Sequence, residues 1–247
     1  MGEFTGLLLL LSIGAIATIL VLSAVIAHDA IHPSRHTAGY AVAHGLPTDP
    51  ADKALPFEQW TLDLPGGAAL PVWEITASGS GPTAVFVHGW GQSRIDMLAH
   101  VDPWLEKCAR LVLYDRRGHG DASGSTARLG TNEHIDLRAL LDRLGNGPYI
   151  LVGHGSGAVV TIATAVDAGP DLAITAVAIY DLADDVHVSI CDRLEARGLP
   201  TRPLTDLAML WLRLIGIRQS DTVGAAKDLQ CPLLMDRGPE AIPGENY

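Results

Sequence analysis

The sequence predicts an α/β fold in which a mostly parallel sheet is flanked by helices and preceded by one transmembrane helix. Short apolar runs alternate along the chain with segments of helical periodicity, which is the order of repeated β–α units. The runs are apolar at nearly every position, as expected of strands that are covered on both faces. In front of them, residues 7–27 carry no charge and form a stretch of about 20 residues, enough to cross the apolar part of a bilayer as a helix.

The predicted sheet begins with an antiparallel hairpin over residues 59–64 and 70–77, because Pro65-Gly66-Gly67 between them is a turn sequence. Later apolar runs predict strands over residues 83–88, 110–115, 149–154, 174–181 and 231–235. Apolar residues at helical spacing predict helices over residues 94–108, 133–144 and 156–168.

These elements divide the chain into an anchor (residues 1–29), a linker rich in His and Pro (30–57) and an α/β domain (58–247). Residues 182–228 interrupt the alternation and form a cap-like segment, with a helix over 204–217 that is apolar around most of its circumference. Three roles for this helix stay open: a cover for the mouth of the site, contact with a membrane, or packing against the sheet edge.

A cleaved signal peptide is the alternative to a retained anchor, with Val25-Ile26-Ala27 as its processing site. The anchor is favoured because Glu3 and no Lys or Arg precedes the apolar run, and because the run exceeds the about 7–15 apolar residues of a signal peptide. Arg35, just beyond the run, favours a cytoplasmic position for the following domain, although the side of the membrane stays open.

Charge and cysteine content exclude several classes of partner. The formal net charge of −11 repels phosphate backbones, so we expect no nucleic-acid partner. Cys108, Cys191 and Cys231 are too far apart in sequence to indicate a disulfide framework or a zinc site. His28, His32 and His36 repeat at a spacing that suits a metal on a helix, but Pro33 disfavours that helix, so we expect solvated histidines. We expect no metal and no cofactor, and nothing in the sequence indicates an oligomeric state.

Three glycine-containing motifs each follow a predicted strand: Val87-His88-Gly89-Trp90-Gly91, Asp115-Arg116-Arg117-Gly118-His119-Gly120-Asp121-Ala122-Ser123 and Gly153-His154-Gly155-Ser156-Gly157. In order, they resemble the HGxG turn, the DxRGHGxS loop and the nucleophile elbow of the α/β-hydrolase fold superfamily. The resemblance covers about residues 57–243. With its anchor and linker, the chain is similar to membrane-tethered serine hydrolases of that superfamily.

The resemblance implies roles for the motif residues. The backbone N–H groups of Trp90 and Ser156 would form the oxyanion hole, which stabilises negative charge on the substrate oxygen. Asp115 and Arg117 would hold loops together beneath the site. The remaining motif residues would shape the turns: His88, Gly89, Gly91, Gly118, Gly120, Gly153 and Gly157.

At the elbow the chain departs from the family pattern, because Gly155 stands at the apex where the family has its nucleophilic serine. Ser156 is an alternative nucleophile, but as the first helical residue it more readily caps the helix. The family's base follows its eighth strand, whereas no histidine follows His187 in this sequence. For the acid, Glu240 matches the family position and Asp236 is the alternative; either one is equally well an ordinary surface carboxylate.

Three functional hypotheses follow. The protein is an anchored relative of ester and amide hydrolases without a working Ser-His-acid triad, an active esterase or lipase-like enzyme that uses Ser156, or a shortened form of an active parent. Trp90 and the apolar helix over 204–217 favour a hydrophobic or acyl small-molecule ligand. The membrane is the other expected partner.

Overall fold

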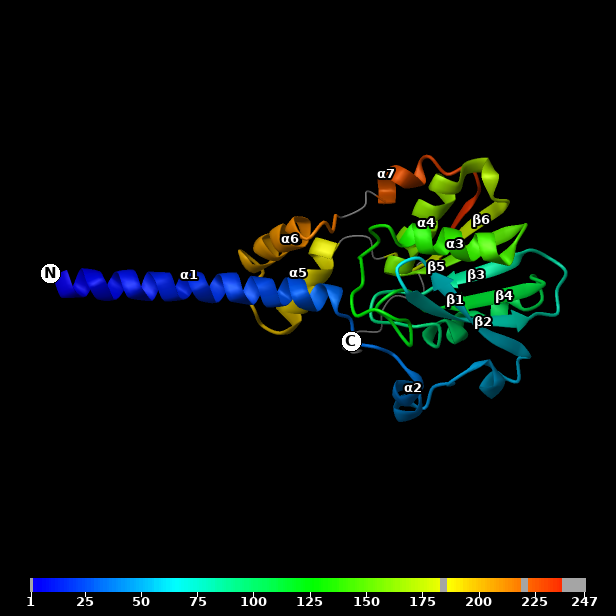
Figure 1. The fold of residues 1–247 in the computed structure, drawn as a ribbon, viewed down its shortest axis with the longest axis horizontal. Helices are drawn as coiled ribbons and strands as arrows, with labels where there is room; N and C mark the ends of the chain where they lie inside the picture. Colours follow the sequence, from blue (N-terminus) through cyan, green and yellow to red (C-terminus); the bar gives the residue numbers. More distant parts are fainter. Residues whose placement is uncertain (1, 183–185, 219–221, 237–247) are drawn as a thin grey trace. The chain divides into compact units, whose positions relative to one another are not determined.

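The structure is a computed structural model that describes residues 2–182, 186–218 and 222–236 (Figure 1). Its contacts divide the chain into two compact units. Unit 1 combines residues 1–32 with 185–218, and unit 2 combines residues 33–184 with 219–247. Each unit is described by itself.

Unit 2 contains a seven-stranded sheet in the order β1-β2-β4-β3-β5-β6-β7. The first two strands form an antiparallel hairpin, β2 pairs antiparallel with β4, and the remaining neighbours are parallel. This confirms the mostly parallel α/β fold. The strand bounds are β1 Phe57–Leu64, β2 Ala68–Thr76, β3 Thr83–Val87, β4 Arg110–Tyr114, β5 Tyr149–His154, β6 Ile174–Tyr180 and β7 Leu233–Asp236.

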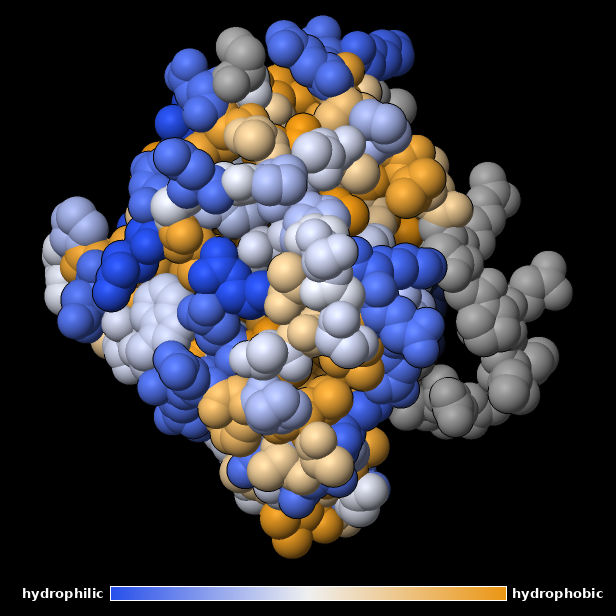
Figure 2. Space-filling view, turned by 90° about the vertical axis from the view of Figure 1, so that its right-hand side faces the viewer, coloured by the Kyte–Doolittle hydropathy of each residue, from blue (hydrophilic) through white to orange (hydrophobic). Residues whose placement is uncertain are grey.

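The two faces of the sheet bury two separate hydrophobic clusters, because successive residues of a strand point to opposite faces. On β3, Val85 and Val87 belong to one cluster, together with residues of α3 (Glu133–Leu144) and α4 (Ser156–Ala168). Ala84 and Phe86 belong to the other cluster, which contains Met97, Leu98 and Trp104. The surface seen in Figure 2 mixes hydrophilic and hydrophobic residues.

The prediction of one helix over residues 94–108 is wrong. The chain forms two short 3₁₀ helices there, Asp96–His100 and Asp102–Trp104. Pro103 explains the difference, because proline cannot donate a backbone hydrogen bond and disfavours helical backbone at the preceding residue. Other short helices of unit 2 are α2 (Ala38–His44), α7 (Thr222–Ala226) and 3₁₀ turns at Pro50–Lys53 and Gly169–Asp171.

Unit 1 consists of α1 (Gly2–Ile31), α5 (Val186–Ala196) and α6 (Leu204–Leu214). Within α1, the segment Phe4–Ile31 is long and apolar enough to cross a membrane. The C-terminal half of α1 lies against α6, and the indole Nε1 of Trp211 donates a hydrogen bond to Ser23 Oγ at 3.2 Å. The helix expected over residues 204–217 is thus formed by α6 as far as Leu214, and it packs on the apolar helix α1.

Candidate active site

The turn between β5 and α4 has the backbone of a nucleophile elbow. β5 ends at His154, α4 begins at Ser156, and Gly155 between them has φ 53° and ψ −123°. The N–H of Gly155 donates to the carbonyl oxygen of Tyr180 on β6 at 3.0 Å, which fixes the turn to the neighbouring strand. A positive φ strains any residue with a side chain, so glycine adopts this turn at low cost.

The space above Gly155 is open enough for a side chain. A Cβ atom added there would lie 3.7 Å from the Cα of Gly89 and 3.8 Å from the carbonyl oxygen of Asp181, which are ordinary van der Waals distances. Gly89 belongs to the HGxG-like turn after β3, so two of the three motifs meet at the apex. The apex position is formed and accessible to a side chain, but its residue carries no side-chain nucleophile.

Gly157, two residues later, is glycine for a different reason. A Cβ atom there would overlap the carbonyl oxygens of Val87 and His88. The first turn of α4 thus approaches the end of β3 too closely for a side chain. This close approach brings the start of α4 to the turn that contains Trp90.

Ser156 points its hydroxyl to a guanidinium group. Nη1 of Arg116 donates to Ser156 Oγ at 3.1 Å and also donates to the carbonyl oxygen of His88 at 2.8 Å. The other end of the guanidinium forms a buried ion pair with Glu133 at the start of α3. Because a guanidinium group has no acceptor, it cannot remove the proton of Ser156.

Burial opposes the ionisation of Glu133, but the charge of Arg116 and several hydrogen bonds outweigh it and lower the pKa of this carboxyl group. The backbone N–H groups of Arg128 and Gly130 also donate to Glu133, each at 3.0 Å. The ion pair is therefore charged at neutral pH and joins the second motif to α3. The hydroxyl of Ser156 contacts the arginine of this ion pair.

Two of the motif histidines are buried and neutral. The backbone N–H of Arg116 donates to His88 Nε2 at 3.0 Å, so the ring proton is on Nδ1, which donates to the carbonyl oxygen of Gly89 at 2.8 Å. Burial lowers the pKa of His88, and the neighbouring His119 lowers it further. Burial, together with the charge of Arg116, lowers the pKa of His119 to about 4.

A second group of rings lies at the end of β5. The ring of His100 is 5.2 Å from that of His154 and 5.3 Å from that of Tyr180, centroid to centroid. Burial lowers the pKa of both histidines. These imidazoles are therefore uncharged at neutral pH.

The DxRGHGxS-like loop is held by two carboxylates. Asp115 forms a buried ion pair with Arg94 and accepts from the backbone N–H of Arg94 at 2.7 Å and of Asp121 at 2.8 Å. Arg117 donates to Asp136 of α3 at 2.9 Å. Several glycines of the motifs have positive φ: Gly91, Gly118, Gly120 and Gly155. Asp115 and Arg117 thus bind loops and helices around the site.

Of the two candidate acids, the structure describes only Asp236. Asp236 is the last residue of β7 and pairs in register with Tyr180 of β6. Glu240 lies outside the described residues. Trp90, whose N–H is one expected oxyanion donor, follows Gly89, the residue that lies next to the apex Gly155. Gly153 precedes the elbow on β5. Within the part of the chain that the structure describes, no group of three or more His, Cys, Asp or Glu residues is arranged to hold a metal.

Sequence reasoning did not find the contact between Arg116 and Ser156 or the pairing of Arg116 with Glu133. These residues are 40 and 17 positions apart, and no motif spacing joins them. The first arginine of Asp115-Arg116-Arg117, Arg116, was the available signal, because it occupies the variable position of the motif. Its partners become evident only when β3, β4 and β5 are placed side by side.

Comparison with known proteins agrees with this geometry. Residues 84–242 match the family described as the alpha/beta hydrolase family. A 2-(acetamidomethylene)succinate hydrolase of Mesorhizobium japonicum is 32% identical over 50% of this chain and 44% of its own length. The sn-1-specific diacylglycerol lipase ABHD11 of Mus musculus is 35% identical over 31% of this chain and 25% of its own. This chain thus spans less than half the length of either relative.

An esterase of Pyrococcus furiosus has the same fold, with a TM-score of 0.64 and 18% identity over 83% of this chain and 75% of its own. The family match covers more than half of the chain and includes all three motifs. The chain belongs to the alpha/beta hydrolase family.

Proposed function

We propose that this protein is a membrane-anchored member of the family that binds a hydrophobic or acyl ligand without serine-hydrolase turnover. The observation that carries the proposal is Gly155 at the apex of a fully formed elbow. Attack on an acyl carbon needs a nucleophile held at that apex, and a glycine supplies none. The expected oxyanion donors, the N–H groups of Trp90 and Ser156, are backbone groups, so the site would keep its affinity for a carbonyl oxygen without the nucleophile.

Ser156 supports the same conclusion. Its hydroxyl accepts a hydrogen bond from Arg116, which in turn is fixed by Glu133 and His88. A serine nucleophile needs a base that accepts its proton, and a guanidinium group is only a donor. The side chain of Ser156 therefore serves to hold Arg116 and the first turn of α4.

The ligand class is supported by the relatives and by the anchor. One relative is named a 2-(acetamidomethylene)succinate hydrolase and another a diacylglycerol lipase, and the compounds in both names carry acyl groups. In this chain, Phe4–Ile31 is suited to cross a membrane, which would keep the α/β domain beside lipids. Arg35 beyond the anchor favours a cytoplasmic domain.

A fluorophosphonate probe, which labels only activated serine nucleophiles, tests the proposal. The full chain in lipid nanodiscs is treated with the probe beside an active serine esterase as positive control. We expect no labelling of this chain and full labelling of the esterase. Labelling that disappears in Ser156→Ala would show an active hydrolase that uses Ser156 and would overturn the proposal.

A further inference from the structure

One stripe of α1 is covered by the rest of unit 1. Ser23, Ala27 and Ala30 are buried, and they recur at the spacing of one helix face. Small residues at such positions allow two helices to approach closely. The covering helix is α6, whose Trp211 donates to Ser23 Oγ. Figure 1 shows α5 and α6 along the C-terminal half of α1.

The length of α1 determines how deep in a bilayer the contact between Ser23 and Trp211 would lie. A membrane-spanning helix needs about 20 apolar residues at about 1.5 Å each. Glu3 and Asp29 are the charged residues that bound the apolar run. Any stretch of about 20 residues placed between them contains Ser23. If α1 crosses a bilayer, Ser23 therefore lies inside the apolar layer or at its edge, and Trp211 lies at the same level.

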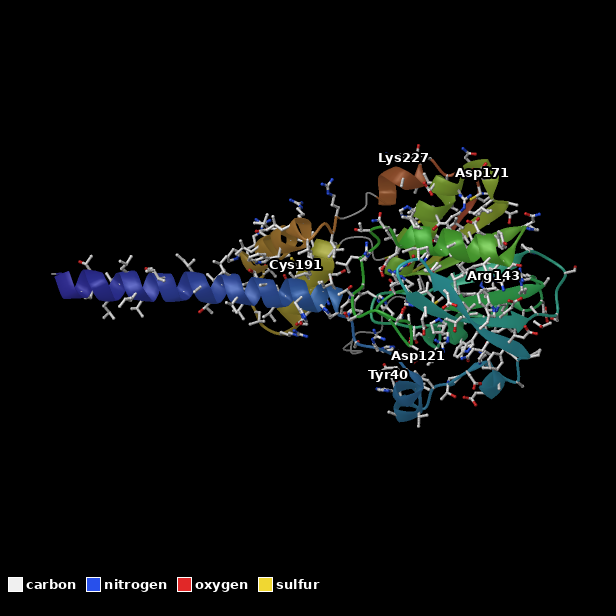
Figure 3. The ribbon with its side chains drawn as sticks, viewed as in Figure 1. Tyr40, Asp121, Arg143, Asp171, Cys191 and Lys227 are labelled. Atoms are coloured by element: carbon white, nitrogen blue, oxygen red, sulfur yellow. The ribbon has the colours of Figure 1, made fainter. Side chains whose placement is uncertain are left out.

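α6 has a second apolar face that neither α1 nor α5 covers. Leu204, Ala208 and Leu212 are buried, whereas Leu210, Leu214 and Ile215 are 51%, 68% and 58% exposed. In water, such a patch of large side chains is unfavourable, because apolar side chains are stabilised by removal from water. The N-terminal half of α1 also exposes large apolar side chains, which project from the helix in Figure 3.

The charges of this segment suit a lipid surface. Residues 186–218 contain five arginines and three carboxylates, whereas the whole chain carries a formal net charge of −11. Arg213 lies between Leu210 and Leu214 in the sequence, and Arg218 follows Ile215 by three residues. Arginines beside an apolar patch can remain at the headgroups while the apolar side chains enter the acyl region.

We propose that α6 lies in the membrane interface beside α1, with Leu210, Leu214 and Ile215 inserted among the lipids. This proposal rests on the anchor of the proposed function, because the depth of α6 follows from α1 crossing the bilayer. Trp211 would then be an interfacial tryptophan, with its ring in the lipid and its N–H bound to Ser23. The cap-like segment would be a membrane-bound element of the protein.

Quenching by brominated lipids measures this contact. Two variants each add one tryptophan at an exposed isoleucine: Ile215→Trp directly after α6, and Ile135→Trp on α3 as the matched control. The two positions are 58% and 55% exposed. The full chain is reconstituted in phosphatidylcholine vesicles with bromine near the glycerol end of the acyl chains. We expect the added fluorescence to be largely lost for Ile215→Trp and retained for Ile135→Trp.

Washing the vesicles with alkaline carbonate, which removes peripheral proteins, tests the anchor separately. A chain that stays in the vesicles while Ile215→Trp is unquenched would overturn the proposal for α6 and leave the anchor intact. A chain that washes off would instead overturn the anchor. Shielding of position 215 by cross-linking to a second copy would show that another protein covers the patch, which also overturns the lipid contact.

Discussion

Arg116 donates a hydrogen bond to the hydroxyl of Ser156 at 3.1 Å while its other end pairs with Glu133. The same guanidinium also donates to the carbonyl oxygen of His88. One side chain therefore ties the turn after β3, the loop after β4, the start of α3 and the elbow together. The serine next to the apex is part of this structural network, which gives its hydroxyl a structural partner beside the glycine.

Substitutions of the residues in this network should lower the free energy of unfolding by unequal amounts. Glu133→Gln leaves the charge of Arg116 buried without its partner, so we expect a loss of about 3–5 kcal/mol in the free energy of unfolding. Ser156→Ala removes one hydrogen bond and should cost about 1 kcal/mol. Asp142→Asn, in a more exposed pair with Arg138, should change stability by less than about 1 kcal/mol. Urea denaturation in detergent measures all three, and equal losses for Glu133→Gln and Asp142→Asn would contradict the network.

Three glycines in α4 or directly beside its ends allow the elbow to be tested against matched controls. Gly155 and Gly169 stand at opposite ends of α4 with φ 53° and 51°, and neither has a neighbour that blocks a Cβ atom. We expect Gly155→Ser and Gly169→Ser to cost similar strain, about 1–3 kcal/mol each. Gly157→Ser should cost on the order of 3 kcal/mol or more, because its Cβ atom overlaps backbone oxygens of β3. Thermal unfolding of the three variants measures the order of their stabilities.

Gly155→Ser also tests the chemistry. The new hydroxyl would stand at the apex, yet the nearby His88 has both ring nitrogens in hydrogen bonds with the backbone. A serine hydroxyl needs a base that accepts its proton, and His88 is not available for this role. We therefore expect p-nitrophenyl ester hydrolysis by Gly155→Ser to equal that of Gly169→Ser. Turnover clearly above this control would reveal a base that the proposed function does not include.

The strands and the elbow could be predicted from the sequence because their signals are local. β5 and α4 have the predicted bounds, since an apolar run, a glycine-rich turn and a small-residue helix follow each other directly. Local signals also mislead, as at Pro103, where apolar residues suggested one helix and the chain forms two short turns.

Contacts between distant residues could not be predicted in this way. The apolar circumference of α6 indicates burial, but it does not identify α1 as the partner, and Trp211 and Ser23 are 188 positions apart. The pairing of Arg116 with Glu133 depends in the same way on the completed sheet. The motifs identify the place of the site, whereas the environment of Ser156 requires the fold.

His119 predicts a pH dependence of stability. Its ring is fully buried, and its pKa is lowered to about 4, first by burial and then by the charge of Arg116. Between about pH 6.5 and 4 the unfolded chain binds a proton at this residue that the folded chain does not bind, so stability falls as the pH falls through this range. The full effect is about 3 kcal/mol. Asp115 acts in the opposite direction, because burial raises its pKa to about 6 in spite of Arg94.

A variant therefore isolates the contribution of His119. His119→Gln retains a donor for the carbonyl oxygen of Arg117, which His119 Nδ1 contacts at 2.9 Å, and removes the titration. We expect this variant to lose less stability than the parent chain between pH 7 and pH 4.5, measured by urea denaturation. His44→Gln, at an exposed position of α2, serves as control and should follow the parent. If His119→Gln follows the parent as closely as this control does, the buried imidazole does not determine the acid sensitivity of the fold.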